Sequence, residues 1–144
     1  MTKISIITIC FNNLQEVLDT CRSVDEQTIL PFEHLIINGS TNYETEDYFS
    51  KNEIPSYRKI INERDNGIAD AFNKGIKIAG GDVILLLNSG DCLYDKNVIE
   101  TVIQKFDADK ALMWLHGKYR LNRSGMWVTL GKPFEAKKLY RGMR

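Results

Sequence analysis

Residues 81–91 (GDVILLLNSGD) constrain the fold most strongly, because an apolar run of strand length ends in a short polar loop and a carboxylate. The run at 83–87 lacks the period-two alternation of a strand with one solvent-exposed face. Such a run is typical of a parallel strand covered on both faces. Ligands of open α/β sheets bind at the carboxyl ends of the strands, so we expect Asp91 at a ligand-binding edge.

Strand-like and helix-like segments alternate along the first 106 or so residues. Strands are predicted over residues 4–9, 33–37, 58–62, 83–87 and 111–116, and helices over residues 14–24, 42–49, 68–79 and about 95–106. The alternation predicts an α/β fold with a mostly parallel central sheet and helices on both faces. Residues 119–121 and 126–130 flank a turn at Arg123-Ser124-Gly125, which predicts a hairpin.

Composition excludes several classes of protein. The chain of 144 residues has 19 basic and 19 acidic residues, so it has no overall positive charge with which to bind nucleic acid. Its three cysteines form no CxxC pair and are odd in number, which favours a reduced, cytoplasmic compartment. The apolar run near the N-terminus is too short for a signal peptide or a membrane span.

Several common active-site motifs are also missing from the sequence. It contains no GxxxxGK[ST] loop, no GxGxxG after the first strand and no GxSxG elbow. His34 and His116 lie far apart, without Cys or Glu at zinc-ligand spacing. A phosphoryl-accepting regulatory domain needs clustered acidic residues after the first strand, and residues 10–12 (CFN) supply none.

Three polar loops follow successive predicted strands, at residues 10–12, 38–40 and 88–91. The strand-end rule places all three at one edge of the sheet. There Phe11 could stack on a nucleotide base, and Asn38 and Ser40 could hydrogen-bond a base or ribose. Asp91 could hold Mg²⁺ or Mn²⁺ bridging a diphosphate, since Mg²⁺ commonly uses one or two protein carboxylates plus phosphates.

Each residue also has a purely structural interpretation. Asp91 could cap the following helix, and Phe11 could be a core aromatic. Asp70 and Asn73, three residues apart, could simply form a solvated helix face. Gly67 could be required only for its backbone conformation.

Five segments in order resemble glycosyltransferase family 2, of the GT-A fold: residues 5–12 (SIITICFN), Gln27-Thr28, 36–40 (IINGS), 63–75 (ERDNGIADAFNKG) and 81–91. The resemblance covers the chain to about residue 118 and is greatest to bacterial enzymes of capsule, colanic-acid-type and O-antigen assembly. It implies a Rossmann-like nucleotide-sugar-binding core over residues 1–118. Residues 119–144, a hairpin and basic tail, would begin an acceptor-side region.

The resemblance implies a role for each matching position. Phe11 matches the aromatic residue on the base, Asn38 a base- or ribose-contacting position, and Asp91 the last aspartate of the DxD-type metal motif. The implied nucleotide-sugar-binding residues are Ile9, Phe11, Asn38, Ser40, Asp65, Gly67, Asp70, Asn73, Asn88 and Ser89, with Asp91 as the ligand of Mn²⁺ or Mg²⁺. The chain departs from the family pattern in two ways. Asn38 replaces the usual aspartate, and residues 88–91 keep only one carboxylate of the metal motif, that of Asp91.

The resemblance implies inverting transfer from a nucleotide-diphosphate sugar (UDP, GDP or dTDP type) to a polysaccharide or lipid-linked acceptor. The family's general base is an acidic residue of the second half, so we expect it beyond residue 144. A non-catalytic nucleotide-sugar-binding fragment is the alternative. The basic tail is either solvent-exposed or draws the chain to the inner face of an anionic membrane. The sugar, the acceptor and a homo-oligomeric state stay open.

Overall fold

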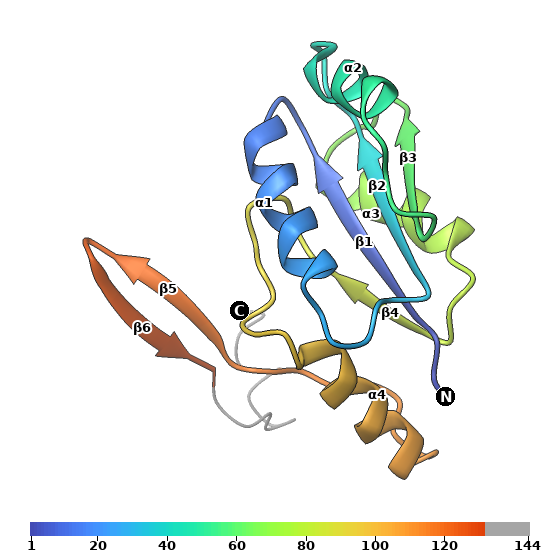
Figure 1. Cartoon of the computed structure of the whole chain (residues 1–144), viewed down its shortest axis with the longest axis vertical. Coiled ribbons are helices and arrows are strands. Elements are labelled where there is room, and N and C mark those ends of the chain that lie inside the picture. The colour runs from blue at the N-terminus through green and yellow to red at the C-terminus, as the bar shows by residue number, and fades with distance from the viewer. Residues whose placement is uncertain (132–144) are drawn as a thin grey trace, which may run out of the picture. The chain divides into compact units, whose positions relative to one another are not determined.

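The computed structural model describes residues 1–131, which fall into two units divided between Ala111 and Leu112. The first unit alternates strands and helices (Figure 1): β1 (Ile4–Cys10), α1 (Leu14–Asp25), β2 (Glu33–Asn38), α2 (Glu44–Lys51), β3 (Arg58–Asn62), α3 (Ile68–Ile78), β4 (Val83–Leu86) and α4 (Val98–Ala108). Its strands form one 4-stranded sheet of order β3-β2-β1-β4, and every pairing is parallel. The predicted α/β class is confirmed.

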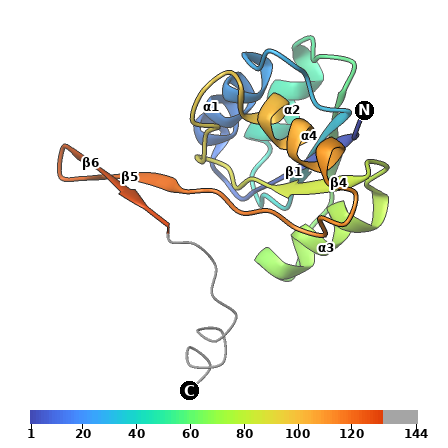
Figure 2. The same cartoon turned by 90° about the horizontal axis from the view of Figure 1, so that it is seen from below.

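Helices cover both faces of this sheet, as predicted. Figure 2 shows α1, α2 and α4 on one side and α3 on the other. On the first side Ile4 and Ile6 of β1 pack with α1 and α4, and on the other Ile7 and Ile9 pack against Ala71 of α3. All seven residues of β1 are buried. Each large aliphatic side chain buried there stabilises the fold by about 1.5–3 kcal/mol.

The prediction that both faces of residues 83–87 are covered is wrong for β4. Val83 and Leu85 pack into the core beside α4, whereas Ile84 and Leu86 are 39% and 49% exposed. The reason is position: within residues 1–131, β4 is one of the two edge strands of the sheet, and α3 lies against β1 and β2. An apolar run therefore identified a strand correctly without revealing that the strand lies at an edge.

The second unit confirms one prediction and corrects another. β5 (Tyr119–Arg123) and β6 (Met126–Leu130) form the expected antiparallel hairpin. Ser124 and Gly125 at its turn have φ values of 50° and 88°, the positive values that a tight two-residue hairpin turn needs. Residues 111–116 form no strand, because a strand needs a hydrogen-bonded neighbour and none pairs with them among the described residues. The predicted basic tail, from Lys132 onward, lies outside the described residues.

Two helix starts differ from prediction. The second helix begins at Glu44, two residues later than predicted, and Asn42 Oδ1 accepts a hydrogen bond from the Glu44 backbone N–H. The last helix of the first unit begins at Val98, a few residues later than expected. Neither shift moves the polar loops that follow the strands.

A buried polar network joins β1, β2, β3 and the end of α1. Arg58 donates through Nε to His34 Nδ1 (3.1 Å) and through its guanidinium to Asp25 (2.6 Å). His34 Nε2 therefore carries the ring proton and donates to Thr8 Oγ1 at 2.9 Å. Burial first, and then the positive charge of Arg58, lower the pKa of His34 to about 3.

This network predicts a loss of stability in acid. His34 is neutral in the folded chain down to a pKa of about 3, whereas an unfolded histidine titrates near 6.5, so the unfolded chain binds more protons between these values. The stabilisation is complete above about pH 6.5 and falls with decreasing pH, by up to about 1.4 kcal/mol per unit. Urea unfolding should give a free energy about 2 kcal/mol lower at pH 5 than at pH 7. In His34→Gln the decrease should be much smaller; an equal decrease would contradict the assignment.

Candidate functional site

The loops after β1, β2 and β4 meet at the carboxyl edge of the parallel sheet, as the strand-end rule predicts. The Asn12 backbone N–H donates to Ser40 Oγ (2.9 Å), and Asn12 Oδ1 accepts from the Thr41 N–H (2.9 Å). On the other side, Asn13 Nδ2 donates to Ser89 Oγ at 2.6 Å. The loop after β1 thus links its two neighbours.

Asn38 is buried at the end of β2, and its side-chain amide is occupied within the protein. Its Oδ1 accepts from the Cys10 thiol (3.1 Å) and the Ser40 N–H (3.2 Å), and its Nδ2 donates to Asn62 Oδ1 (2.9 Å). Burial is the main cause that raises the pKa of Cys10, so the thiol stays protonated as a donor at neutral pH. Asn38 therefore ties β1, β2 and β3 together, and its contact with a nucleotide stays a prediction.

Asp65 reaches across from the loop after β3 to lie over Gly39. A Cβ atom added to Gly39 would lie 2.8 Å from Asp65 Cγ and even closer to Oδ2. The other carboxylate oxygen, Oδ1, accepts from the Gly67 backbone N–H at 2.9 Å. A side chain at position 39 would therefore have to displace the Asp65 carboxylate, which lies over Gly39 between Asn38 and Ser40 in the chain.

The start of α3 carries three further predicted residues. Gly67 has φ 111°, a value that favours glycine. Asp70 accepts from the Asn66 N–H (2.9 Å) and pairs with Lys74 (3.6 Å). The Asn66 bond, more than Lys74, lowers the pKa of Asp70. Asp70 and Gly67 thus shape the loop, whereas Asn73 lies exposed on α3.

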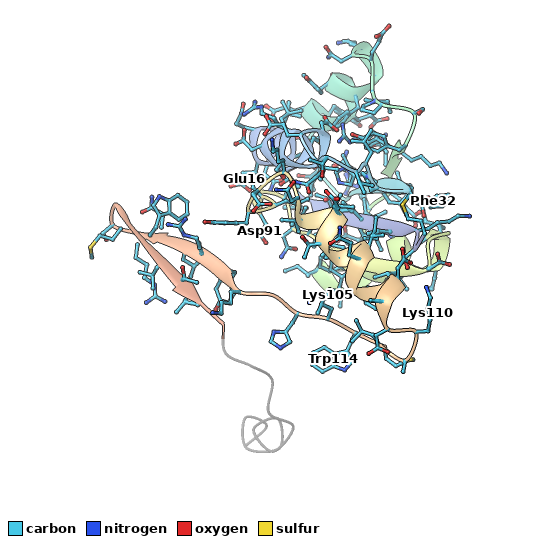
Figure 3. The ribbon with its side chains drawn as sticks, turned by 60° about the horizontal axis from the view of Figure 1, so that its bottom comes forward. Glu16, Phe32, Asp91, Lys105, Lys110 and Trp114 are labelled. Carbon is cyan, nitrogen blue, oxygen red and sulfur yellow. The ribbon has the colours of Figure 1, made fainter. Side chains whose placement is uncertain are left out.

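The loop of residues 88–91 follows β4 and presents a carboxylate to solvent. Within residues 1–131, no hydrogen bond or ion pair engages the exposed Asp91 side chain. Asn88 is also exposed, and Ser89 is half-buried against Asn13. Figure 3 shows Glu16 of α1 beside this loop, where its carboxyl group lies 3.5 Å from a Cβ built on Gly90.

These residues fit a hard divalent cation held jointly with a diphosphate. No group of three or more His, Cys, Asp or Glu in the described part of the chain could hold a metal by itself. Asp91 offers a free carboxylate, with the Asn88 amide oxygen and the Ser89 hydroxyl nearby in sequence. One protein carboxylate is sufficient for Mg²⁺ when phosphates and waters supply its other ligands.

Two predicted site residues, Ile9 within β1 and Phe11 directly after it, differ in which of their groups face the site. The Phe11 ring is 60% exposed and free to stack on a planar ligand. Ile9 packs its side chain among Ile7, Ile37 and Ala71, so only its backbone faces the site. Its carbonyl accepts from the Ser89 N–H at 3.3 Å, which couples β1 to the Asp91 loop.

The sequence matches one known family over almost its whole length. Residues 5–141 match the family described as glycosyl transferase family 2. An uncharacterized glycosyltransferase of Mycobacterium tuberculosis strain H37Rv is 31% identical over 143 residues, which cover 96% of this chain and 53% of that protein. Another from Rickettsia conorii is 30% identical over 128 residues, or 88% of this chain and 21% of the relative. The chain belongs to glycosyl transferase family 2, and it spans about half the length of the mycobacterial relatives it matches.

Solved structures share the fold at low sequence identity. TarS of S. aureus superposes with a TM-score of 0.60 and 22% identity, over 74% of this chain and 20% of TarS. The mannosyltransferase PcManGT from Pyrobaculum calidifontis, in complex with GDP-Man and Mn²⁺, has a TM-score of 0.63 and 13% identity, over 73% of this chain and 32% of that protein. The predicted GT-A fold is confirmed. In residues 1–131 no helix is both long and apolar enough to span a bilayer.

The contact of Asp65 with Gly39 can be tested by a double-mutant cycle. Gly39→Ala should destabilise the chain by about 1–3 kcal/mol, because the new methyl group displaces the Asp65 carboxylate. In an Asp65→Ala background the same substitution should cost much less. Urea unfolding of the four proteins measures the coupling.

Gly117→Ala is the matched control for that cycle. A Cβ at Gly117 meets nothing within 4 Å, so its effect should stay within about 0.5 kcal/mol. Equal costs of Gly39→Ala with and without Asp65 would show that the carboxylate does not need the space.

Proposed function

We propose that this chain is the nucleotide-sugar-binding part of an inverting, metal-dependent glycosyltransferase. The observation that carries the proposal is the exposed carboxylate of Asp91, which has no partner within residues 1–131 and lies at the edge where the strand-end loops meet. Family membership gives the reaction class. We further propose a polysaccharide or lipid-linked acceptor of the capsule, colanic-acid or O-antigen type, reached at the inner face of the membrane.

The relatives of known structure support this choice of ligand. TarS of S. aureus has been solved in complex with UDP and with UDP-GlcNAc, and PcManGT with GDP-Man and Mn²⁺. A nucleotide-diphosphate sugar has a planar base, ribose hydroxyls and a doubly charged leaving group. Phe11, Ser40 and Asp91 offer, in that order, an exposed ring, a hydroxyl and an anion that can share a cation with the diphosphate.

The reaction is a substitution at the anomeric carbon of the sugar. An acceptor hydroxyl oxygen forms the new bond to that carbon, the bond to the diphosphate oxygen breaks, and its electron pair leaves with the diphosphate. The hydroxyl proton passes to a general base, which we place in the second half of the longer protein. Asp91 would hold a divalent cation, which when bound would neutralise charge on the diphosphate.

The chain's own residues then bind and orient the donor. Phe11 contributes stacking to the base, and Ser40 contributes a hydroxyl near the ribose. Asp65, over Gly39, contributes an anionic acceptor for base N–H or ribose O–H groups. The bonds of Asn12, Asn13 and Asn38 hold these loops in place before the donor binds. A preorganised site costs less conformational entropy on binding.

A non-catalytic nucleotide-sugar-binding fragment is the second candidate. It is favoured by the length of the chain, which spans about half the length of the two Mycobacterium tuberculosis relatives that are 31% identical to it. Incubation with radiolabelled UDP-GlcNAc or GDP-Man separates the two. Release of free sugar by this chain, absent in Asp91→Asn, would exclude a purely binding role.

Thermal unfolding with nucleotide diphosphates tests donor binding. UDP or GDP at about 100 times its Kd, with Mn²⁺, should stabilise the chain by about 2.7 kcal/mol, which raises Tm by several degrees. Asp91→Asn removes the negative charge while keeping the side-chain shape. It should abolish the Mn²⁺-dependent part of the shift.

The matched control is Glu53→Gln, an exposed carboxylate between the end of α2 and the start of β3. Its Mn²⁺-dependent shift should equal that of the wild-type chain. No shift with UDP, GDP or dTDP, even at millimolar concentration, would refute the proposed ligand class. A full shift in Asp91→Asn would refute Asp91 as the metal ligand.

A further inference from the structure

Three polar side chains lie at helical spacing along one face of α1 and just beyond its end: Thr20, Ser23 and Gln27. We call them the α1 polar stripe. They stand on the otherwise apolar side of the helix that also buries Val17 and Val24. Thr20 is fully buried and Gln27 is 7% exposed. Buried polar groups require partners, so their contacts show what they do.

Thr20 binds the backbone of the Asp91 loop at two successive residues. Its hydroxyl oxygen accepts from the Gly90 N–H at 2.9 Å. Its nearest acceptor is the Asp91 carbonyl oxygen, 2.8 Å from Thr20 Oγ1. The carbonyl oxygens of Glu16 (3.1 Å) and Asn88 (3.4 Å) are more distant acceptors for the same hydroxyl. The Gly90 N–H also donates to the Glu16 carbonyl of α1 at 3.2 Å. Helix α1 therefore holds the peptide groups on both sides of the Gly90–Asp91 bond, and Thr20 is the side chain that contacts both of them.

Ser23 and Gln27 continue the same contact along the chain. Ser23 Oγ accepts from the Leu93 N–H at 3.2 Å. Gln27 donates through Nε2 to the Asp95 carbonyl (2.6 Å) and accepts through Oε1 from the Ile99 N–H (3.1 Å). Residues 87–97 form neither helix nor strand. Some of their N–H groups donate to backbone carbonyls, as Ser89 does to Ile9, whereas the Leu93 N–H and the Asp95 carbonyl bond these side chains of α1 instead.

The direction of the Asp91 carboxylate depends on this backbone. Asp91 itself forms no side-chain hydrogen bond within the described residues, so its neighbours cannot orient it directly. Gly90, the residue before it, has φ 90° and could adopt many other conformations. The Thr20 hydroxyl restrains both residues, because it binds the N–H of one and the carbonyl of the other.

We propose that the α1 polar stripe is the positioning element of the cation–diphosphate loop, with Thr20 as its main residue. Thr20 acts through Asp91: it holds the loop backbone so that the carboxylate points to where the cation and the diphosphate bind. Ser23 and Gln27 anchor the rest of the segment to the same helix. This inference rests on the proposed function, since it assigns the stripe a role in that site.

Mn²⁺ titration of the nucleotide-dependent thermal shift tests the proposal. The full chain with saturating UDP or GDP is titrated with Mn²⁺, and the concentration for half-maximal stabilisation is recorded. Thr20→Val keeps the side-chain shape and removes both hydrogen bonds, so it should raise this concentration by about tenfold or more. Thr20→Ser keeps the hydroxyl and should stay within about threefold of wild type.

Thr8→Val is the matched control for a buried threonine. It removes the hydroxyl that contacts His34 beneath α1, without touching residues 88–99. It should lower Tm and leave the half-maximal Mn²⁺ concentration unchanged. A general effect of lost stability would instead move the two variants together.

Ser23→Ala tests the stripe without changing Thr20 and serves if Thr20→Val does not fold. It should raise the half-maximal Mn²⁺ concentration in the same direction by a smaller factor. If the half-maximal Mn²⁺ concentration is unchanged in Thr20→Val, the positioning role is overturned and the proposed function is not. The same holds for Ser23→Ala if that variant has to replace Thr20→Val. A wild-type chain that shows no Mn²⁺-dependent response overturns the proposed function and this inference with it.

Discussion

The parallel pairing of β1 with both β2 and β4 is the constraint on which the rest of the first unit depends. β1 is the strand whose seven residues are all buried, and it is hydrogen-bonded along both edges. Parallel neighbours require crossover connections, which the helices supply, and every strand then ends at the same edge. The loops of the candidate site meet because β1 sets the direction of its neighbours.

Side chains add to the few backbone hydrogen bonds that hold those loops. Asn12, Asn13 and Asn38 each bridge two segments, and Thr20 does the same from α1. Amide and hydroxyl groups suit this task, since they donate and accept at once. At Asn38, residue type alone does not show that the side-chain amide also bonds within the protein, while its predicted contact with a nucleotide stays a prediction.

Sequence periodicity predicted most of the first unit and failed where the answer lay in distant residues. The buried runs at 4–9 and 33–37 and the helix at 68–79 follow from local pattern, and the structure confirms them. The exposure of Ile84 does not follow from the local pattern, because an apolar run carries no information about which strand lies at an edge of the sheet. The strand predicted at 111–116 fails for a related reason, since pairing needs a neighbour. The contact between Asp65 and Gly39 joins different loops, so no local sequence pattern predicts it. Thr20 did carry a local signal, because it is a polar residue on an otherwise apolar helix face.

A metal site with one free carboxylate makes particular demands on its scaffold. Two adjacent carboxylates attract a cation strongly by themselves, whereas one carboxylate leaves most of the coordination to the diphosphate and water. Under the proposed function, the cation and the nucleotide therefore bind together, and each strengthens the binding of the other. With Asp91 as the one carboxylate proposed to bind the cation, the geometry of the complex depends on where that carboxylate points. That dependence explains why an exposed side chain such as Asp91 would be carried on a backbone fixed from a buried helix face.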